Sequence, residues 1–139
     1  MSKIKLLALD LDGTLLTHDK QISVENRVAI KQAQAAGVHV VITTGRPLKA
    51  IEHILTELDL LVASEYSITF NGGLVQRNNG DILIKKEMSR EDLKQIYAVF
   101  EPLGLPMDVI SDGIVYGVPS KGNHSLYRQA NPTLTFIDV

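Results

Sequence analysis

Cysteine is absent from this chain of 139 residues, and there is neither a long hydrophobic run nor an excess of one charge. Without cysteine there is no disulfide framework, no thiolate metal site and no cysteine nucleophile. The formal net charge is −2, which disfavours nucleic-acid and membrane-surface binding because such proteins usually present a basic surface. The first apolar run is interrupted at Asp10, too soon for a signal peptide or a membrane span. We therefore expect a cytoplasmic protein.

The overall composition is that of a globular protein, with 45% apolar and 22% charged residues. A chain of this length can bury one real core but is short for two complete domains. It contains no internal repeats and no low-complexity tracts.

The most informative stretch is the apolar run that ends in Asp10-Leu11-Asp12-Gly13-Thr14. Such a run is typical of a buried strand at the centre of a parallel sheet. An unpaired carboxylate is costly in an apolar interior, so Asp10 and Asp12 are expected at the carboxyl end of the strand, where open α/β sheets bind ligands. Residues two apart on a strand point the same way, so both carboxylates can address one site while Leu11 turns inward. Two hard oxygen donors suit Mg²⁺.

A strand–helix–strand pattern follows this stretch. Ser23 is a good N-cap for a helix over Val24–Ala36, and Val38–Thr43 reads as the next strand. Apolar residues at helical spacing predict a second helix over Leu48–Leu58, before a third strand at Ser67–Phe70. Short connections of this kind predict parallel strands joined by right-handed crossovers.

The second and third strands also end in residues able to bind a ligand. Thr44 is expected at the same sheet edge as Asp10, where its hydroxyl and the backbone N–H groups near Gly45 can bind a phosphate oxygen. A plain strand-to-helix turn is the alternative. Asn71 follows the third strand and orders either the site or only the turn. A hairpin is then predicted through Asn78-Asn79-Gly80.

The pattern changes after Ile84. A helix is expected after Ser89, followed by short strands at Met107–Ile110 and Ile114–Val118 and a further strand pattern from Thr133. The sequence therefore predicts two domains, residues 1–84 and residues 85–139.

Three motifs together, Asp10 to Thr14, Thr44-Gly45-Arg46-Pro47 and Asn71-Gly72, resemble the haloacid dehalogenase superfamily. Within it, the chain is most similar to the Cof-type (YidA-like) sugar-phosphate phosphatases. The resemblance is close over residues 4–84 and looser beyond. It implies an α/β fold, with the N-terminal part of a Rossmann-like, three-layer parallel sheet and the start of an α/β cap domain of the C2 type.

The resemblance also implies an activity and the residues that perform it. The activity is Mg²⁺-dependent hydrolysis of small phosphorylated metabolites, such as sugar phosphates, through an aspartyl-phosphate. Asp10 would be the nucleophile, and Asp12 the general acid and then the base. Mg²⁺ would be held by the Asp10 carboxylate and the Asp12 backbone carbonyl. Thr44, Gly45 and Asn71 would bind the phosphoryl group, and the second domain would cover the site.

The sequence departs from the family in its second half. The expected third motif, a lysine, and the fourth, an acidic loop that completes the metal site, are both absent. We therefore expect a partial chain that binds Mg²⁺ weakly and hydrolyses little phosphate ester by itself.

Three other functions stay open. The chain can be a catalytically inert fragment, or a phosphotransferase or phosphomutase of the same superfamily. A signalling receiver is disfavoured, because Thr44 and Asn71 stand where a receiver carries its acceptor Asp. The expected partner is a small phosphate ester, and the sequence leaves its identity and the oligomeric state open.

Overall fold

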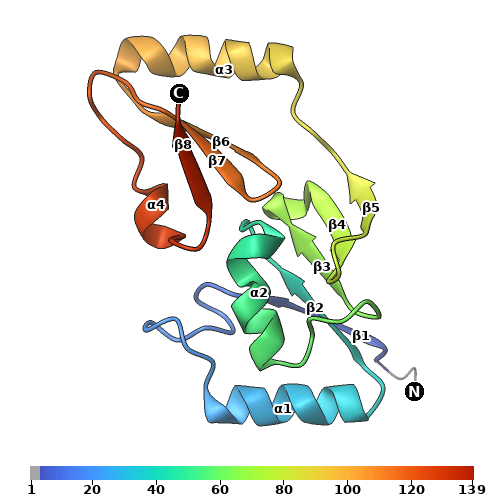
Figure 1. Cartoon of the computed structure of the whole chain (residues 1–139). Helices are drawn as coiled ribbons and strands as arrows, with labels where there is room; N and C mark the ends of the chain where they lie inside the picture. The colour runs from blue at the N-terminus through green and yellow to red at the C-terminus, as the bar shows by residue number, and fades with distance from the viewer. Residues whose placement is uncertain (1–3) are drawn as a thin grey trace. The chain divides into compact units, whose positions relative to one another are not determined.

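Two separate β-sheets organise the chain, one in each of its two units (Figure 1). The computed structural model describes residues 4–139. The N-terminal unit is Met1–Lys86 and the C-terminal unit is Glu87–Val139.

The N-terminal unit is built on a five-stranded sheet with the order β1-β2-β3-β4-β5. Its strands are β1 Leu6–Asp10, β2 His39–Thr43, β3 Tyr66–Thr69, β4 Leu74–Arg77 and β5 Ile82–Lys85. β1, β2 and β3 run parallel, whereas β4 and β5 are each antiparallel to the strand before them. The predicted parallel pairing and the predicted hairpin are confirmed.

Two helices connect the parallel strands, α1 (Val24–Ala35) and α2 (Leu48–Glu57). α1 begins where predicted, because the Ser23 hydroxyl accepts a hydrogen bond from the Asn26 N–H (3.2 Å). It ends before Gly37, whose φ of 78° is the left-handed conformation that stops helices. α2 buries one apolar face against the rest of the unit, formed by Ala50, Ile51, Ile54 and Leu55.

The hydrophobic core of this unit joins β2, both helices and the segment that follows β1. Its buried members are Leu11, Leu15, Leu16, Ile22, Ile30, Val40, Ile42, Ile51, Ile54, Leu55, Leu58 and Leu60. Four of these residues belong to the segment between β1 and α1, so burial of their side chains anchors that loop.

The expectation that β1 is a buried central strand is wrong. Leu6 is 56% exposed, Leu7 is also exposed, and β1 pairs only with β2 among residues 4–139. β2, which has a neighbour on each side, buries Val40, Val41 and Ile42. The difference arises because burial of a strand depends on what lies beside it in the sheet, which its own sequence does not specify.

The C-terminal unit contains a three-stranded sheet with the order β6-β7-β8. Its elements are α3 Arg90–Leu103, β6 Met107–Ser111, β7 Ile114–Val118, α4 Tyr127–Ala130 and β8 Thr135–Asp138. β6 and β7 are antiparallel, whereas β7 and β8 are parallel and joined through α4. The predicted helix and strands are confirmed, and α4 is an addition to them. No helix among residues 4–139 is long and apolar enough to cross a lipid bilayer.

Candidate active site

The three parallel strands bring their carboxyl ends together at one edge of the N-terminal sheet. Asp10, the last residue of β1, lies opposite Thr43 of β2, and Thr43 lies opposite Ile68 of β3. The loops that carry the predicted site residues all start at this edge, as expected for a ligand site in a parallel α/β sheet.

The loop after β1 buries its apolar side chains and exposes its carboxylates. Leu11 is fully buried, whereas Asp10 and Asp12 on either side of it are exposed. Gly13 has a φ of 78°, which turns the backbone so that the Thr14 hydroxyl donates to Asp10 Oδ2 (3.3 Å). The predicted inward Leu11 is confirmed, and Asp10 presents its carboxylate to solvent.

Asp12 is held by two cations. Its Oδ1 lies 2.7 Å from Lys20 Nζ and 2.7 Å from Arg46 Nη2, and its Oδ2 accepts from Arg46 Nε (3.1 Å). The two Arg46 contacts form a bidentate pair, the strongest arrangement of a guanidinium and a carboxylate. Arg46 lies in the loop after β2, so this pair ties the first site loop to the second.

These contacts lower the pKa of Asp12. Partial burial by itself raises its pKa, but the hydrogen bond from Lys20 and the charge and hydrogen bonds of Arg46 outweigh burial. The net effect holds the pKa of the Asp12 carboxyl below its ordinary value, so the group is ionised at neutral pH.

The second and third site loops form a continuous hydrogen-bonded set. Thr44 is only 7% exposed, and its hydroxyl accepts from the Arg46 N–H (3.1 Å). Its own N–H donates to the Ile68 carbonyl (2.9 Å), and its carbonyl accepts from the Asn71 N–H (3.2 Å). A Cβ on Gly45 would lie 2.8 Å from Asn71 Oδ1, so only glycine leaves room for the amide. Thr44, Gly45 and Asn71 are therefore neighbours.

The structure brings the predicted residues together and adds two more. Asp12, Arg46, Thr44 and Asn71 are connected by direct contacts, and Asp10 joins them through the register of β1 and β2. The sequence interpretation gave Arg46 no role, although its position directly after Gly45 at a strand end was a signal. Lys20 lies in an irregular loop eight residues after Asp12, where no sequence pattern points to it.

The oxygen donors at this edge fit a magnesium ion that keeps most of its water. Among residues 4–139 there is no group of three or more His, Asp or Glu side chains able to hold a metal. Mg²⁺ is commonly bound by one or two carboxylates, with waters and substrate phosphates completing its octahedron. The Asp12 carboxylate is engaged by Lys20 and Arg46, which is compatible with the donors that the family resemblance implies, the Asp10 carboxylate and the Asp12 main-chain carbonyl.

Known proteins are similar to this chain over nearly its whole length. A family model described as haloacid dehalogenase-like hydrolase matches residues 7–137. A Bacillus subtilis protein, 5-amino-6-(5-phospho-D-ribitylamino)uracil phosphatase YwtE, is 39% identical over 135 residues, which is 93% of this chain and 45% of that protein. The chain thus spans about half the length of the curated relatives it matches.

Solved structures share the fold. A haloacid dehalogenase-like hydrolase from Bacteroides thetaiotaomicron superposes with a TM-score of 0.83 at 22% identity, over 99% of this chain and 52% of that one. BT4131, described as a subclass IIB sugar phosphatase, gives a TM-score of 0.77 at 24% identity, over 96% of this chain and 52% of that one. The mixed α/β fold expected from the sequence is confirmed.

Proposed function

This chain belongs to the haloacid dehalogenase-like hydrolase family, and from that premise we propose that it forms part of a phosphatase for small phosphorylated metabolites. The observation that carries the proposal is the set of contacts that joins Asp12, Arg46, Thr44 and Asn71 at the strand edge beside Asp10. The resemblance inferred from the sequence motifs is confirmed at the level of the family.

In this proposal the Asp10 carboxylate is the nucleophile. Its exposed oxygen attacks the phosphorus of a monoester, a phosphorus–oxygen bond forms to Asp10, and the bond to the leaving alkoxide breaks. Asp12 gives its proton to that alkoxide. In the second half, Asp12 takes a proton from water, the water oxygen attacks phosphorus, and inorganic phosphate leaves with Asp10 restored.

Electrostatics sets a requirement for this reaction. Two unit negative charges 4 Å apart repel by about 4 kcal/mol at an effective dielectric of about 20, so an unscreened carboxylate approaches a phosphate dianion with difficulty. Lys20 and Arg46 are the cations that this chain places at the edge. A Mg²⁺ ion held by Asp10 and the Asp12 carbonyl would supply further positive charge to the phosphoryl oxygens.

The charge state of Asp12 adds a condition. A general acid must carry a proton, whereas Lys20 and Arg46 keep the pKa of Asp12 low and the group ionised. A bound phosphate dianion competes for the same two cations. We propose that their transfer from Asp12 to the phosphoryl oxygens, together with the negative charge of the phosphate beside it, raises the pKa of Asp12. Asp12 then takes a proton from solvent, and this is the proton that it gives to the alkoxide.

The other parts of the proposed enzyme rest on the family resemblance. The C-terminal unit is proposed as the start of a C2-type cap that selects the substrate. Thr44, Gly45 and Asn71 are proposed to bind the phosphoryl group, which fits their mutual contacts and the Thr44 hydroxyl, which accepts from the Arg46 N–H and can still donate its own hydrogen. The proposed substrate is a small phosphate ester in the cytoplasm, the class to which the YwtE substrate belongs.

The test uses beryllium fluoride, which mimics a phosphoryl group on an aspartate. With Mg²⁺ present, ¹⁹F NMR of the full chain should show a bound beryllium fluoride, and Asp10→Asn should abolish it. Asp81→Asn, which removes an exposed carboxylate from the β4–β5 turn, is the matched control and should leave the signal unchanged. Absence of a bound species in the wild-type chain, or its persistence in Asp10→Asn, would contradict the proposal.

A second measurement distinguishes hydrolysis from phosphoryl transfer. Turnover of an aryl phosphate is expected to be low, because the chain spans about half of its curated relatives. The product, measured with a competing alcohol present, should be inorganic phosphate. A phosphorylated alcohol as the main product would identify a transferase instead.

A further inference from the structure

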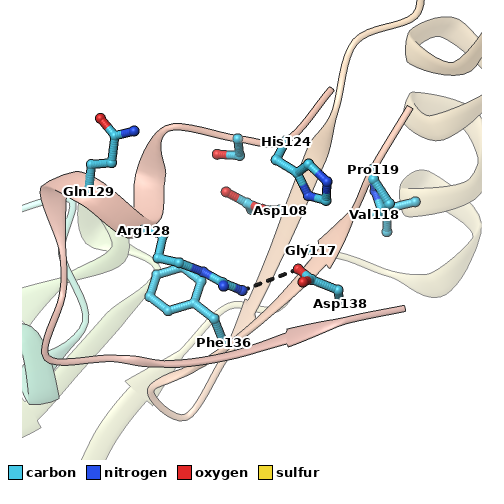
Figure 2. A pocket seen from close by; sticks show the side chains of 10 residues that line it. Asp108, Gly117, Val118, Pro119, His124, Arg128, Gln129, Phe136 and Asp138 are labelled. Carbon is cyan, nitrogen blue, oxygen red and sulfur yellow. Dashed lines mark hydrogen bonds and ion pairs between the residues drawn. The ribbon is translucent and has the colours of Figure 1, made fainter. Parts of the chain in front are cut away.

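A cavity is lined wholly by residues of the C-terminal unit. Its volume is about 360 Å³, and its lining comes from β6, β7, β8, α4 and the loop before α4 (Figure 2). This volume is at the lower end of the range for small-molecule sites, which is about 300 to 1,000 Å³. None of its lining residues belongs to the candidate active site.

A row of three residues across the sheet forms one wall of this cavity. Asp108 of β6 lies opposite Gly117 of β7, and Gly117 lies opposite Asp138 of β8. Residues paired in this way point to the same face of a sheet, so the two carboxylates flank a position without a side chain. A Cβ on Gly117 would lie 3.1 Å from Asp138 Oδ1 and 3.5 Å from Asp108 Oδ1. The absence of a side chain at Gly117 therefore lets the two acidic oxygens approach the same point above the sheet.

The two carboxylates differ in their surroundings. Asp138 accepts from Arg128 Nη2 (3.2 Å), and the Arg128 guanidinium lies 4.9 Å from the centre of the Phe136 ring. Figure 2 shows the Arg128–Asp138 pair as a dashed line across the middle of the view, with Asp108 and His124 drawn above it. Among residues 4–139, the Asp108 side chain makes no hydrogen bond or ion pair. Asp108 is partly exposed to solvent, and it has no partner side chain in the described part of the chain.

The chemistry of the wall selects a class of ligand. An anion is repelled by Asp108, and a neutral polyol brings no positive charge to pair with it. A metal ion lacks ligands, because no group of three metal-binding side chains occurs among residues 4–139. An alkylammonium group carries a positive charge and three donors, which two carboxylates can satisfy.

We propose that this cavity binds a small molecule with a primary amine, whose ammonium group lies between Asp108 and Asp138 above Gly117. The proposal does not depend on the phosphatase function, because the site uses none of the residues of the candidate active site. A binding experiment without phosphate or Mg²⁺ can therefore test it separately.

The experiment titrates the full chain with D-glucosamine and with 1,4-diaminobutane, followed by ¹⁵N NMR and calorimetry. D-glucose is the matched probe without the amine. At least one amine should bind saturably, with shifts at Gly117 and its neighbours, and D-glucose should bind at least about tenfold more weakly, since a charge-assisted hydrogen bond is worth that much or more.

Two variants assign the binding to the cavity. Asp108→Asn should weaken amine binding about tenfold or more, and Gly117→Ala should do the same because the added methyl group would crowd the Asp138 carboxylate. Glu91→Gln, which removes one exposed negative charge from the first turn of α3, is the charge-matched control and should bind as the wild type does.

The proposal is overturned if neither amine binds saturably, if D-glucose binds as tightly as the amines, or if Asp108→Asn binds the amines as the wild type does. An equal loss of amine affinity in Glu91→Gln would show that the amine is attracted by the overall negative charge of the chain and does not bind at this cavity. The NMR spectrum of each variant shows whether the C-terminal unit remains folded.

Discussion

At the scale of single residues, the pKa of Asp12 depends on two side chains from different loops. Arg46→Gln should raise the pKa of Asp12 toward its ordinary value, because the variant removes a bidentate cationic partner. Carboxyl ¹³C NMR titration measures this directly. Lys49→Met, which removes an exposed pair with Glu52, is the control and should leave Asp12 unchanged. An unaltered pKa in Arg46→Gln would contradict the assignment.

The sign of the associated stability change follows from linkage. A carboxyl group whose pKa is depressed in the folded chain stabilises it above the ordinary pKa, near 4, and this contribution is lost as the pH falls through the folded pKa. Arg46→Gln should therefore show a smaller loss of stability on acidification. The Asp12 side chain is 43% exposed, so solvent screening limits the whole effect to about 1 kcal/mol or less.

The backbone conformation of Asn71 can be tested by comparing two variants that both lack its side-chain amide. Its φ of 54° and ψ of 37° place it in the left-handed region, where glycine is unstrained and alanine is disfavoured by about 1 to 2 kcal/mol. Urea denaturation should therefore find Asn71→Ala less stable than Asn71→Gly by about 1 kcal/mol. Equal stabilities of the two variants would show that the backbone at position 71 leaves the left-handed conformation without cost.

The polar residues of the site could be predicted from the sequence only where a strand carries them. Asp10, Asp12, Thr44 and Asn71 follow apolar runs, and parallel strands bring such ends together. Lys20 could not be predicted, because its approach to Asp12 depends on the path of an irregular loop whose anchors are Leu15, Leu16 and Ile22.

At the scale of secondary-structure elements, one buried amide links β3 to the turn after β4. The Asn78 side chain is 3% exposed, accepts from the Ser67 hydroxyl (2.6 Å) and donates to the Leu60 carbonyl (2.7 Å). Asn78→Ala leaves both partners unsatisfied and should lower the free energy of unfolding by about 1 to 3 kcal/mol.

The neighbouring Asn79 provides the matched control for that measurement. It is exposed and bonds only within its own turn, to Asp81. Asn79→Ala should change the free energy of unfolding by about 0.5 kcal/mol or less. If the two variants lose a similar free energy of unfolding in urea, the buried hydrogen bonds of Asn78 do not stabilise the unit more than the exposed ones of Asn79 do.

The open side of β1 predicts an association that depends on concentration. A strand edge with exposed apolar side chains can pair with another chain, and a lysine on such an edge opposes pairing. Leu6→Lys should therefore reduce the weight-average mass measured by sedimentation at high concentration. His18→Lys, in the exposed loop after β1, is the control and should leave it unchanged. A wild-type chain that stays monomeric at all concentrations would contradict the prediction.

Helices were more predictable than the exposure of strands. The limits of α1 follow from Ser23 and Gly37, and the apolar spacing of α2 identifies its buried face. The apolar run of β1 suggested burial, but an edge strand and a central strand can have the same sequence. The four-residue α4 shows no periodicity from which to predict it.

At the scale of the whole molecule, the junction between the two units can be tested by proteolysis. β5 and the residues up to Ser89 are exposed, and the units divide after Lys86, two residues beyond the boundary that the sequence predicted. Brief treatment with trypsin should therefore cleave first after Lys85 or Lys86, as measured by mass spectrometry. The variant with both lysines changed to Gln should lose this early cut. First cleavage inside either unit would contradict this division.

The same strand that leaves one flank of the sheet open also carries the proposed nucleophile at its tip. A polypeptide that formed backbone hydrogen bonds along Leu6–Asp10 would restrict the φ and ψ angles of this segment, and with them the directions available to the Asp10 carboxylate. In the proposed phosphatase, such a partner would favour one orientation of the Asp10 carboxylate without touching phosphate, because the entropy of orienting Asp10 would already be lost before substrate arrives.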